Sequence, residues 1–136
     1  MKLNKILIVG VLALSSLAFT TSSFDQAKPA AWNAPAAAKS KANPLKGDAA
    51  SVANGKTLFN QHCKSCHGAK GKGDGSKAAQ LDTDCGDFTS AAVQSQTDGE
   101  LFYKTSEGRK DMPSFKKKIP DAEDIWAVVN YMRTLK

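Results

Sequence analysis

The chain has 136 residues, which is room for one ordinary domain, and its composition is that of a soluble globular protein and not of a coiled coil or a membrane-spanning protein. The formal net charge is +6, but from Gly47 onward thirteen basic residues stand against twelve acidic ones, so the surplus lies in the first 46 residues. A nearly neutral folded part argues against a nucleic-acid-binding protein.

The first 23 residues have the pattern of a secretory signal peptide. Lys2 and Lys5 precede a mostly apolar run over residues 6–19, and small residues suited to cleavage lie at its end. The run is shorter than the roughly 20 residues that a membrane-spanning helix needs. We therefore expect an exported protein, in the periplasm or on the outer face of the cytoplasmic membrane, and retention of the segment as an anchor is the less favoured alternative.

Residues 24–46 are predicted to be a flexible tether. The segment is rich in Ala, Lys, Pro and Ser, and its prolines are spaced so that no long helix can form. Trp32 has no apolar neighbours at helical or strand spacing, so we expect it to be an exposed linker residue. Such a tether is compatible with peripheral or tethered association with a membrane.

The predicted first helix of the folded part starts near Gly47. Asp48 or Ser51 can cap it, and it runs into Cys63. Four of its positions fall on one face and are expected to pack inward: Val52, Gly55, Leu58 and Phe59. Closely spaced glycines over residues 68–75 then predict a loop.

Two more helices are predicted after this loop. Thr97 and Glu100 form a capping box for a short helix that Gly108 is placed to end. The last helix follows Pro120 with Asp121 as its cap, and its apolar face consists of Ile125, Val128, Val129 and Met132. No alternating strand pattern occurs, so the expected fold class is all-α.

The sequence Cys63-Lys64-Ser65-Cys66-His67 has the spacing of a covalent attachment site for c-type haem. On a helical turn the two thiols point the same way and can form thioethers with the two haem vinyl groups. His67 follows at a spacing that brings its imidazole beneath the same ring, where it can ligate the iron. One covalently bound haem c is therefore the expected cofactor.

Two other interpretations of these residues stay open at this point. A thioredoxin-like redox pair uses the same cysteine spacing, but it needs a βαβ unit that the sequence does not predict. A structural zinc site could combine Cys63, Cys66 and Cys85 with a histidine, although zinc sites usually present their ligands as two spaced pairs.

Residues 47–136 resemble a class I, mono-haem bacterial cytochrome c domain. The resemblance rests on the attachment motif, on Gly55 and Phe59 as the small residue and aromatic of the first helix, and on the Met112 loop. It implies a small helical domain wrapped around one covalently attached haem. The family's proline that follows the ligand histidine by about a dozen residues is absent, so a backbone carbonyl within residues 76–80 is expected to accept the imidazole N–H in its place.

Met112 is the expected second axial ligand of the iron. It lies in a loop before Pro113, whereas Met132 has the spacing of a core residue on the last helix. His62 is expected to be an exposed helix residue. Four apolar side chains are expected to keep water from the iron: Leu81, Phe88, Phe102 and Phe115.

A haem ligated on both faces by His67 and Met112 exchanges electrons and does not catalyse a reaction. The expected function is therefore that of a one-electron carrier, not an enzyme, whose partners are redox proteins such as a dehydrogenase and a terminal oxidase or reductase. The alternatives are a dedicated electron-transfer subunit of one such complex and, less favoured, a haem peroxidase. Cys85 has no partner left in the chain, and we expect a free, largely buried thiol, with an intermolecular disulfide as the alternative.

Overall fold

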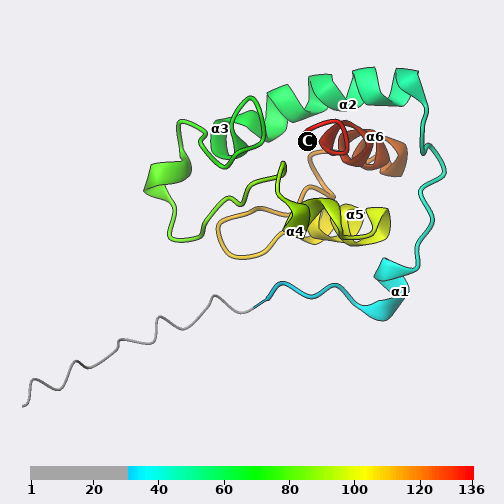
Figure 1. The fold of residues 1–136 in the computed structure, drawn as a ribbon, viewed down its shortest axis with the longest axis horizontal. Helices are drawn as coiled ribbons and strands as arrows, with labels where there is room; N and C mark the ends of the chain where they lie inside the picture. The colour runs from blue at the N-terminus through cyan, green and yellow to red at the C-terminus, as the bar shows by residue number, and fades with distance from the viewer. Residues whose placement is uncertain (1–30) are drawn as a thin grey trace, which may run out of the picture. The chain divides into compact units, whose positions relative to one another are not determined.

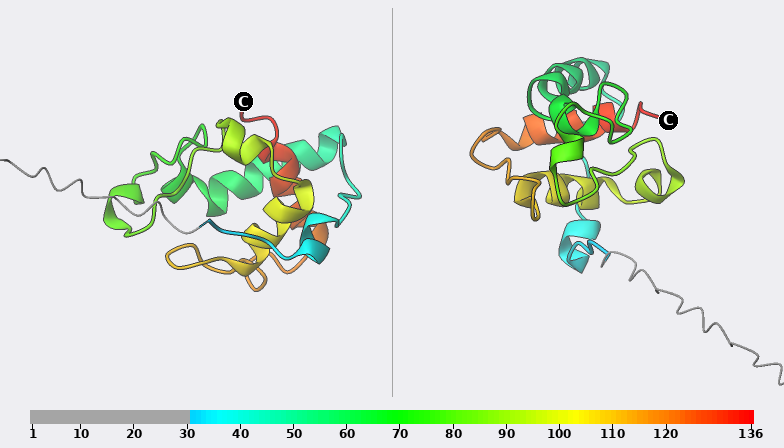
Figure 2. Two further views of the ribbon diagram at one scale, coloured as in Figure 1. Left: turned by 60° about the horizontal axis from the view of Figure 1, so that its bottom comes forward. Right: turned by 90° about the vertical axis from the view of Figure 1, so that its left-hand side faces the viewer.

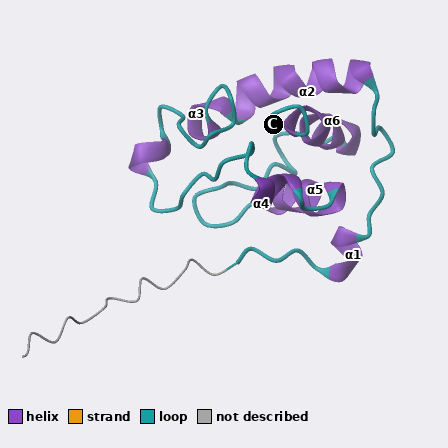
Figure 3. Cartoon of the chain, in the orientation of Figure 1, coloured by secondary structure: helices purple, strands orange, loops and turns teal. Residues whose placement is uncertain are grey.

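The computed structural model describes residues 31–136, and over these residues the chain is built from helices and loops without a β-strand (Figures 1 and 3). The helices are α1 (Ala36–Lys39), α2 (Ala49–His62), α3 (Lys64–His67), the 3₁₀-helix η1 (Ala78–Gln80), α4 (Ala91–Gln94), α5 (Asp98–Glu107) and α6 (Ala122–Met132). The all-α prediction is confirmed. The predicted signal peptide and the first part of the predicted tether lie outside the described residues.

The helix ends agree with the capping residues read from the sequence. Asp48 accepts hydrogen bonds from two backbone amides in the first turn of α2, and Asp121 caps α6 by accepting one from the amide of Glu123. The capping box of Thr97 and Glu100 is formed at the start of α5, and Gly108 ends that helix with a φ of +68°. None of the described helices is long and apolar enough to cross a membrane.

Helices α2 and α6 cross in close contact, and α6 also contacts α5 (Figures 1 and 2). At the crossing, a Cβ atom added to Gly55 would lie 1.9 Å from the carbonyl oxygen of Ala127, so only a residue without a side chain permits this approach. One turn further along α2, Phe59 is fully buried, and its ring centroid lies 5.2 Å from that of Tyr131. The core is thus organised around the crossing.

More residues of α6 are buried than the apolar face predicted from the sequence contains. Every residue from Ile125 to Met132 is buried, because α6 is covered by α2, α5 and loops from several sides. Asn130 is the polar residue of this run, and its side chain is satisfied by hydrogen bonds to the carbonyl of Leu45 (2.7 Å) and to Ser51 Oγ (2.9 Å).

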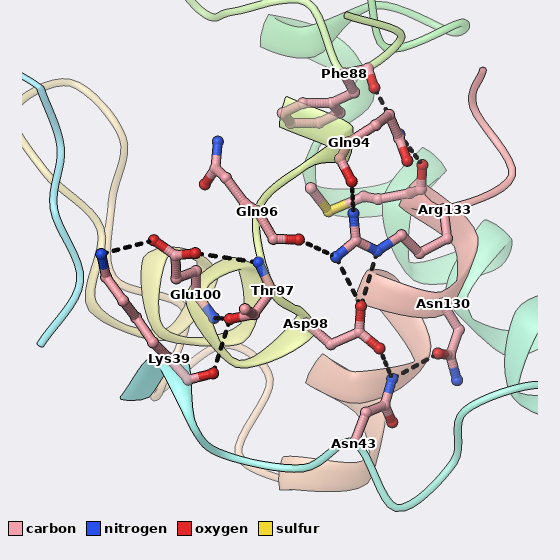
Figure 4. Close-up of polar contacts among 11 residues, drawn as sticks. Lys39, Asn43, Phe88, Gln94, Gln96, Thr97, Asp98, Glu100, Asn130 and Arg133 are labelled. Carbon is pink, nitrogen blue, oxygen red and sulfur yellow. Dashed lines mark hydrogen bonds and ion pairs between the residues drawn. The ribbon is translucent and has the colours of Figure 1, made fainter. Parts of the chain in front are cut away.

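The end of α6 is tied to the loop before α5 by two side chains (Figure 4). Arg133 forms an ion pair with Asp98 (2.7 Å) and donates hydrogen bonds to the carbonyls of Gln94 and Gln96. The Gln94 amide in turn donates to the carbonyls of Phe88, Met132 and Leu135. These contacts fix the end of the segment that leads from α3 to α5, from Phe88 to Asp98.

The prediction of a flexible tether is wrong for residues 32–46. Residues 32–136 form one compact unit, and within it Ala34 is 5% exposed. Asn43 donates hydrogen bonds to Asp98 (3.1 Å) and Asn130 (2.7 Å), which lie far away in the sequence. The prolines do prevent a long helix, but long-range polar contacts order the segment without one.

Replacing Gly55 with Ala tests the crossing. In an ordinary helix interior this change stabilises by about 1 kcal/mol. Here the added methyl group forces α2 away from α6, and we expect a loss of at least about 2 kcal/mol. Urea unfolding followed by circular dichroism measures the difference. Asn60→Ala, on the exposed side of the same helix, is the control and should cost little; an equal or stabilising effect of Gly55→Ala would contradict the packing.

Candidate haem site

The two motif cysteines and His67 are brought together where α2 passes into α3. Cys63 ends α2 and begins α3, and its carbonyl accepts hydrogen bonds from the amides of Cys66 (3.1 Å) and His67 (2.9 Å). The loop that follows returns to this turn, because the amides of Gly75 and Lys77 donate to the carbonyls of Cys66 and Ser65. The turn is therefore held in one conformation by backbone contacts.

A cavity of about 300 Å³ lies beside this turn. Its wall includes Cys63, Cys66 and His67 from the motif and Met112 from the loop after α5. Of the four residues expected to exclude water from the iron, Leu81, Phe88 and Phe115 line the cavity. The sequence-predicted site residues thus meet around one space.

Phe102 does not belong to this cavity. Its ring stacks on Trp126 at 4.2 Å and lines a different cavity, of about 420 Å³, between α5 and the start of α6. The prediction was wrong because successive residues of a helix point in different directions, and Leu101 is the one that lines the haem-site cavity. His62 was also placed wrongly: it is half-buried, lines the cavity and packs its ring edge-on against Phe115.

The imidazole of His67 is held by an aromatic ring and lacks a polar partner at one nitrogen. Its ring stacks on Phe88, with centroids 4.5 Å apart, and its Nδ1 atom is buried without a hydrogen bond. Burial lowers the pKa of His67, and the backbone of Cys85 offsets part of that lowering. The imidazole is therefore neutral at neutral pH, which is the form that ligates iron.

A backbone carbonyl within residues 76–80 was expected beside His67, whereas the backbone that raises the pKa of His67 is that of Cys85. The chain at residues 75–77 faces α3 with its amides, so those residues serve as donors to the motif turn. The Cys85 side chain is half-buried and lines the cavity, whereas a largely buried thiol packed beneath the loop was expected.

The motif thiols differ in environment. Burial raises the pKa of Cys63 to about 12, and the neighbouring Cys66 adds to the rise. A thiol with so high a pKa is almost entirely protonated at neutral pH and is a weak nucleophile by itself. In the folded chain, the Cys63 thiol therefore reacts slowly unless another group takes up its proton.

Met112 is presented by a tight turn. The amide of Arg109 donates to the carbonyl of Met112 (2.8 Å), the reverse bond measures 3.0 Å, and Lys110 has a φ of +53°. Gly108 is needed next to this turn, because a Cβ atom there would lie 2.4 Å from the Met112 carbonyl oxygen. Met132, from α6, lines the same cavity, so both methionines of the described residues face it.

Several residues of the cavity wall were not found from the sequence. They are Trp32, Val93, Gln96, Leu101, Lys104, Thr105 and Arg109. Trp32 belongs to the supposed tether, and the others come from α4, α5 and the adjoining loops. Only the helical periodicity of α5, which places Leu101 and Thr105 on one face, could have identified some of them.

The donors present fit a covalently attached haem. The cavity combines two thiols at attachment spacing, a neutral histidine with a buried, unpartnered nitrogen, and a thioether from a separate loop. A buried nitrogen without a partner calls for a ligand or ion. Among the described residues, no group of three or more His, Cys, Asp or Glu side chains could hold a metal ion by itself.

Comparison with known proteins gives a family match. A family model described as "Cytochrome c" matches residues 52–136. None of the curated proteins matches the chain significantly.

Among solved structures, a chain of the "Kuenenia stuttgartiensis reducing HAO-like protein complex Kustc0457/Kustc0458" is similar, with a TM-score of 0.61 and 24% identity over 68% of this chain. The match covers 46% of that chain, so the present chain corresponds to less than half of it, and the likeness concerns the fold alone. The "KustC0563 c-type cytochrome" is 31% identical, with a TM-score of 0.53 over 60% of this chain and 96% of that one. A point mutant of Kustc0563 gives 32% identity and a TM-score of 0.52 over 61% and 99% of the two chains.

Replacing Gly108 with Ala tests the turn that presents Met112. Gly47→Ala is a matched control, because Gly47 also has a positive φ (+85°) but no atom within 4 Å of an added Cβ. We expect the control to lose about 1 kcal/mol from the backbone conformation alone. Gly108→Ala should lose clearly more and should speed hydrogen exchange at the amides of Arg109 and Met112. Equal losses in the two variants would show that the close approach at Gly108 is unimportant.

Proposed function

The chain belongs to the cytochrome c family, whose members carry a covalently bound c-type haem, and from this premise we propose that it is a one-electron carrier between exported or membrane-bound redox enzymes. The observation that carries the proposal is the single cavity into which Cys63, Cys66, His67 and Met112 all project from two separate chain segments.

The chain's own residues have distinct tasks in this proposal. The thiols of Cys63 and Cys66 would hold the haem covalently, and the neutral imidazole of His67 and the thioether of Met112 would ligate its iron. When bound, the haem supplies an iron that alternates between the ferrous and ferric states. The stack of Phe88 on His67 and the apolar wall at Leu81 and Phe115 fix the ligand and keep water out.

Export is part of the proposal, and the pattern of residues 1–23 supports it. The expected partners are redox proteins, such as a dehydrogenase and a terminal oxidase or reductase. A dedicated subunit of one such complex is the second candidate. A haem peroxidase needs an acid–base group beside an open iron face. His62 is the available imidazole on the cavity wall for that role.

Covalent attachment is the first test. Protein recovered from a periplasmic extract of cells with c-type maturation machinery should keep its haem through acid–acetone extraction. The double variant Cys63→Ser/Cys66→Ser should lose it, whereas Cys85→Ser should keep it. The retained haem should titrate reversibly as a one-electron centre and should not turn over peroxide. Extraction of the haem from the unaltered chain, or peroxide turnover that depends on His62, would overturn the electron-carrier proposal.

The second axial ligand is tested by comparing the two methionines that line the cavity. The oxidised protein should show the weak charge-transfer band of methionine-ligated ferric haem at the red end of the spectrum. Met112→Ala should abolish the band and allow carbon monoxide to bind the ferrous iron. Met132→Leu, which keeps the core volume of a residue that is 5% exposed, should retain the band. Persistence of the band in Met112→Ala, or its loss in Met132→Leu, would move the role to Met132.

A further inference from the structure

The loop that presents Met112 is held at its base by contacts with α5. The amide of Phe115 (3.1 Å) and the hydroxyl of Ser114 (2.6 Å) both donate hydrogen bonds to the carbonyl of Ser106. Asp111, which belongs to the tight turn just before Met112, is exposed. The contacts with α5 therefore hold the base of the loop, and a different contact holds its turn.

That contact is a hydrogen bond from the backbone amide of Thr83 to the carboxylate of Asp111 (2.9 Å), two residues that are 28 positions apart. Within the described part of the chain, the backbone groups of residues 82–86 make no hydrogen bond to another backbone group. The amide of Gly86 is satisfied locally, by the carboxylate of Asp84 (2.8 Å). The bond to Asp111 is thus the one that connects an amide of this segment to a distant loop.

Both partners of this bond line the haem-site cavity, and each adjoins a residue of the candidate site. Asp111 directly precedes Met112. Thr83 lies in the segment that leads to Phe88, whose ring stacks on the imidazole of His67. The bond therefore links the loop that carries the thioether to the segment that contacts the histidine.

A carboxylate is well suited to this contact, because a hydrogen bond from a backbone amide to a charged acceptor is stronger than one to a neutral acceptor. The Asp111 charge also acts on the cavity itself. Burial, Cys66, Asp84 and Asp111 all raise the pKa of the Cys85 thiol. Removal of Asp111 thus has two effects, the loss of a hydrogen bond and the loss of a charge, and an experiment has to separate them.

We propose that Asp111 is a positioning residue for the second axial ligand, because its bond to Thr83 holds the turn that presents the Met112 thioether to the cavity. The inference rests on the proposed function, since it requires a haem that Met112 ligates. The Asp111 carboxylate acts through the backbone and not on the iron. Without the bond the turn is freer to move, so the thioether should leave the iron more often and another ligand should take its place more readily.

Imidazole added to the oxidised, haem-loaded full chain measures this dissociation, because it binds the ferric iron where the methionine has left. The charge-transfer band of methionine-ligated haem disappears as imidazole binds. Asp111→Ala should raise the apparent affinity for imidazole about tenfold, the effect of losing one hydrogen bond to a charged group. Asp111→Asn keeps an acceptor oxygen in the same place, so its affinity should stay within about threefold of that of the unaltered chain.

Asp82→Ala is the matched control, because it removes the same charge from an exposed position in the same segment as Thr83. Its affinity for imidazole should equal that of the unaltered chain. If Asp111→Ala and Asp82→Ala bind imidazole alike, the bond does not position Met112 and the proposal is overturned. It is also overturned if Asp111→Asn behaves as Asp111→Ala does, since the charge and not the hydrogen bond would then be responsible.

Hydrogen exchange on the same protein tests the bond itself. Relative to an unstructured peptide of the same sequence, the amide of Thr83 should exchange slowly in the unaltered chain and in Asp82→Ala. In Asp111→Ala it should exchange about tenfold faster, while the amides of α2 and α6 keep their rates, because the change is local. Unprotected exchange at Thr83 in the unaltered chain, or no change in Asp111→Ala, would contradict the proposed role of Asp111.

Failure of this inference can be told from failure of the proposed function. Acid–acetone extraction and the charge-transfer band of the unaltered chain show whether the haem is covalently bound and ligated by methionine. If either is missing, the proposed function fails and the role of Asp111 falls with it. A chain that has both, but in which Asp111→Ala matches Asp82→Ala, contradicts only the role of Asp111.

Discussion

The close approach of α2 and α6 at Gly55 is the constraint on which the rest of the site depends. Because the backbone of α6 at Ala127 occupies the space of a Cβ atom at residue 55, the two helices can meet in essentially one register. Phe59 and Tyr131 then pack against each other one turn further along. This contact fixes where α2 ends, and its last residues lead directly into the turn that carries Cys63, Cys66 and His67. The attachment motif is thus positioned by a helix crossing two turns before it.

The opposite wall of the cavity depends on the C-terminal end of α6. Arg133 and Gln94 tie that end to the segment between Phe88 and Asp98. Phe88 stacks on His67, so the same contacts that place the start of α5 also hold the imidazole of His67 in orientation. Contacts with α6 therefore position both walls of the cavity. These contacts explain why nearly the whole of this helix is buried.

The sequence predicted the features that depend on local chemistry. Caps such as Asp48 and Thr97 and the motif at residues 63–67 act over a few residues, and the structure places them as expected. The errors concern contacts between distant residues. The order of residues 32–46 depends on Asn43, which contacts partners 55 and 87 residues away. The direction in which the Phe102 side chain points depends on which side of α5 meets α6. The sequence of a short helix with apolar residues at neighbouring positions does not specify that side.

The three cysteines of the chain share one cavity, and their environments bear on how a haem can be attached. Disulfide formation proceeds through a thiolate. Burial and the neighbouring Cys66 raise the pKa of Cys63 to about 12. Burial, Cys66 and the carboxylates of Asp84 and Asp111 also raise the pKa of Cys85. In the folded chain, both thiols are therefore held mainly in the protonated form, which slows their oxidation to a disulfide. The protonation of Cys63 likewise slows the uncatalysed addition of its thiol to a haem vinyl group, because the thiolate is the nucleophile.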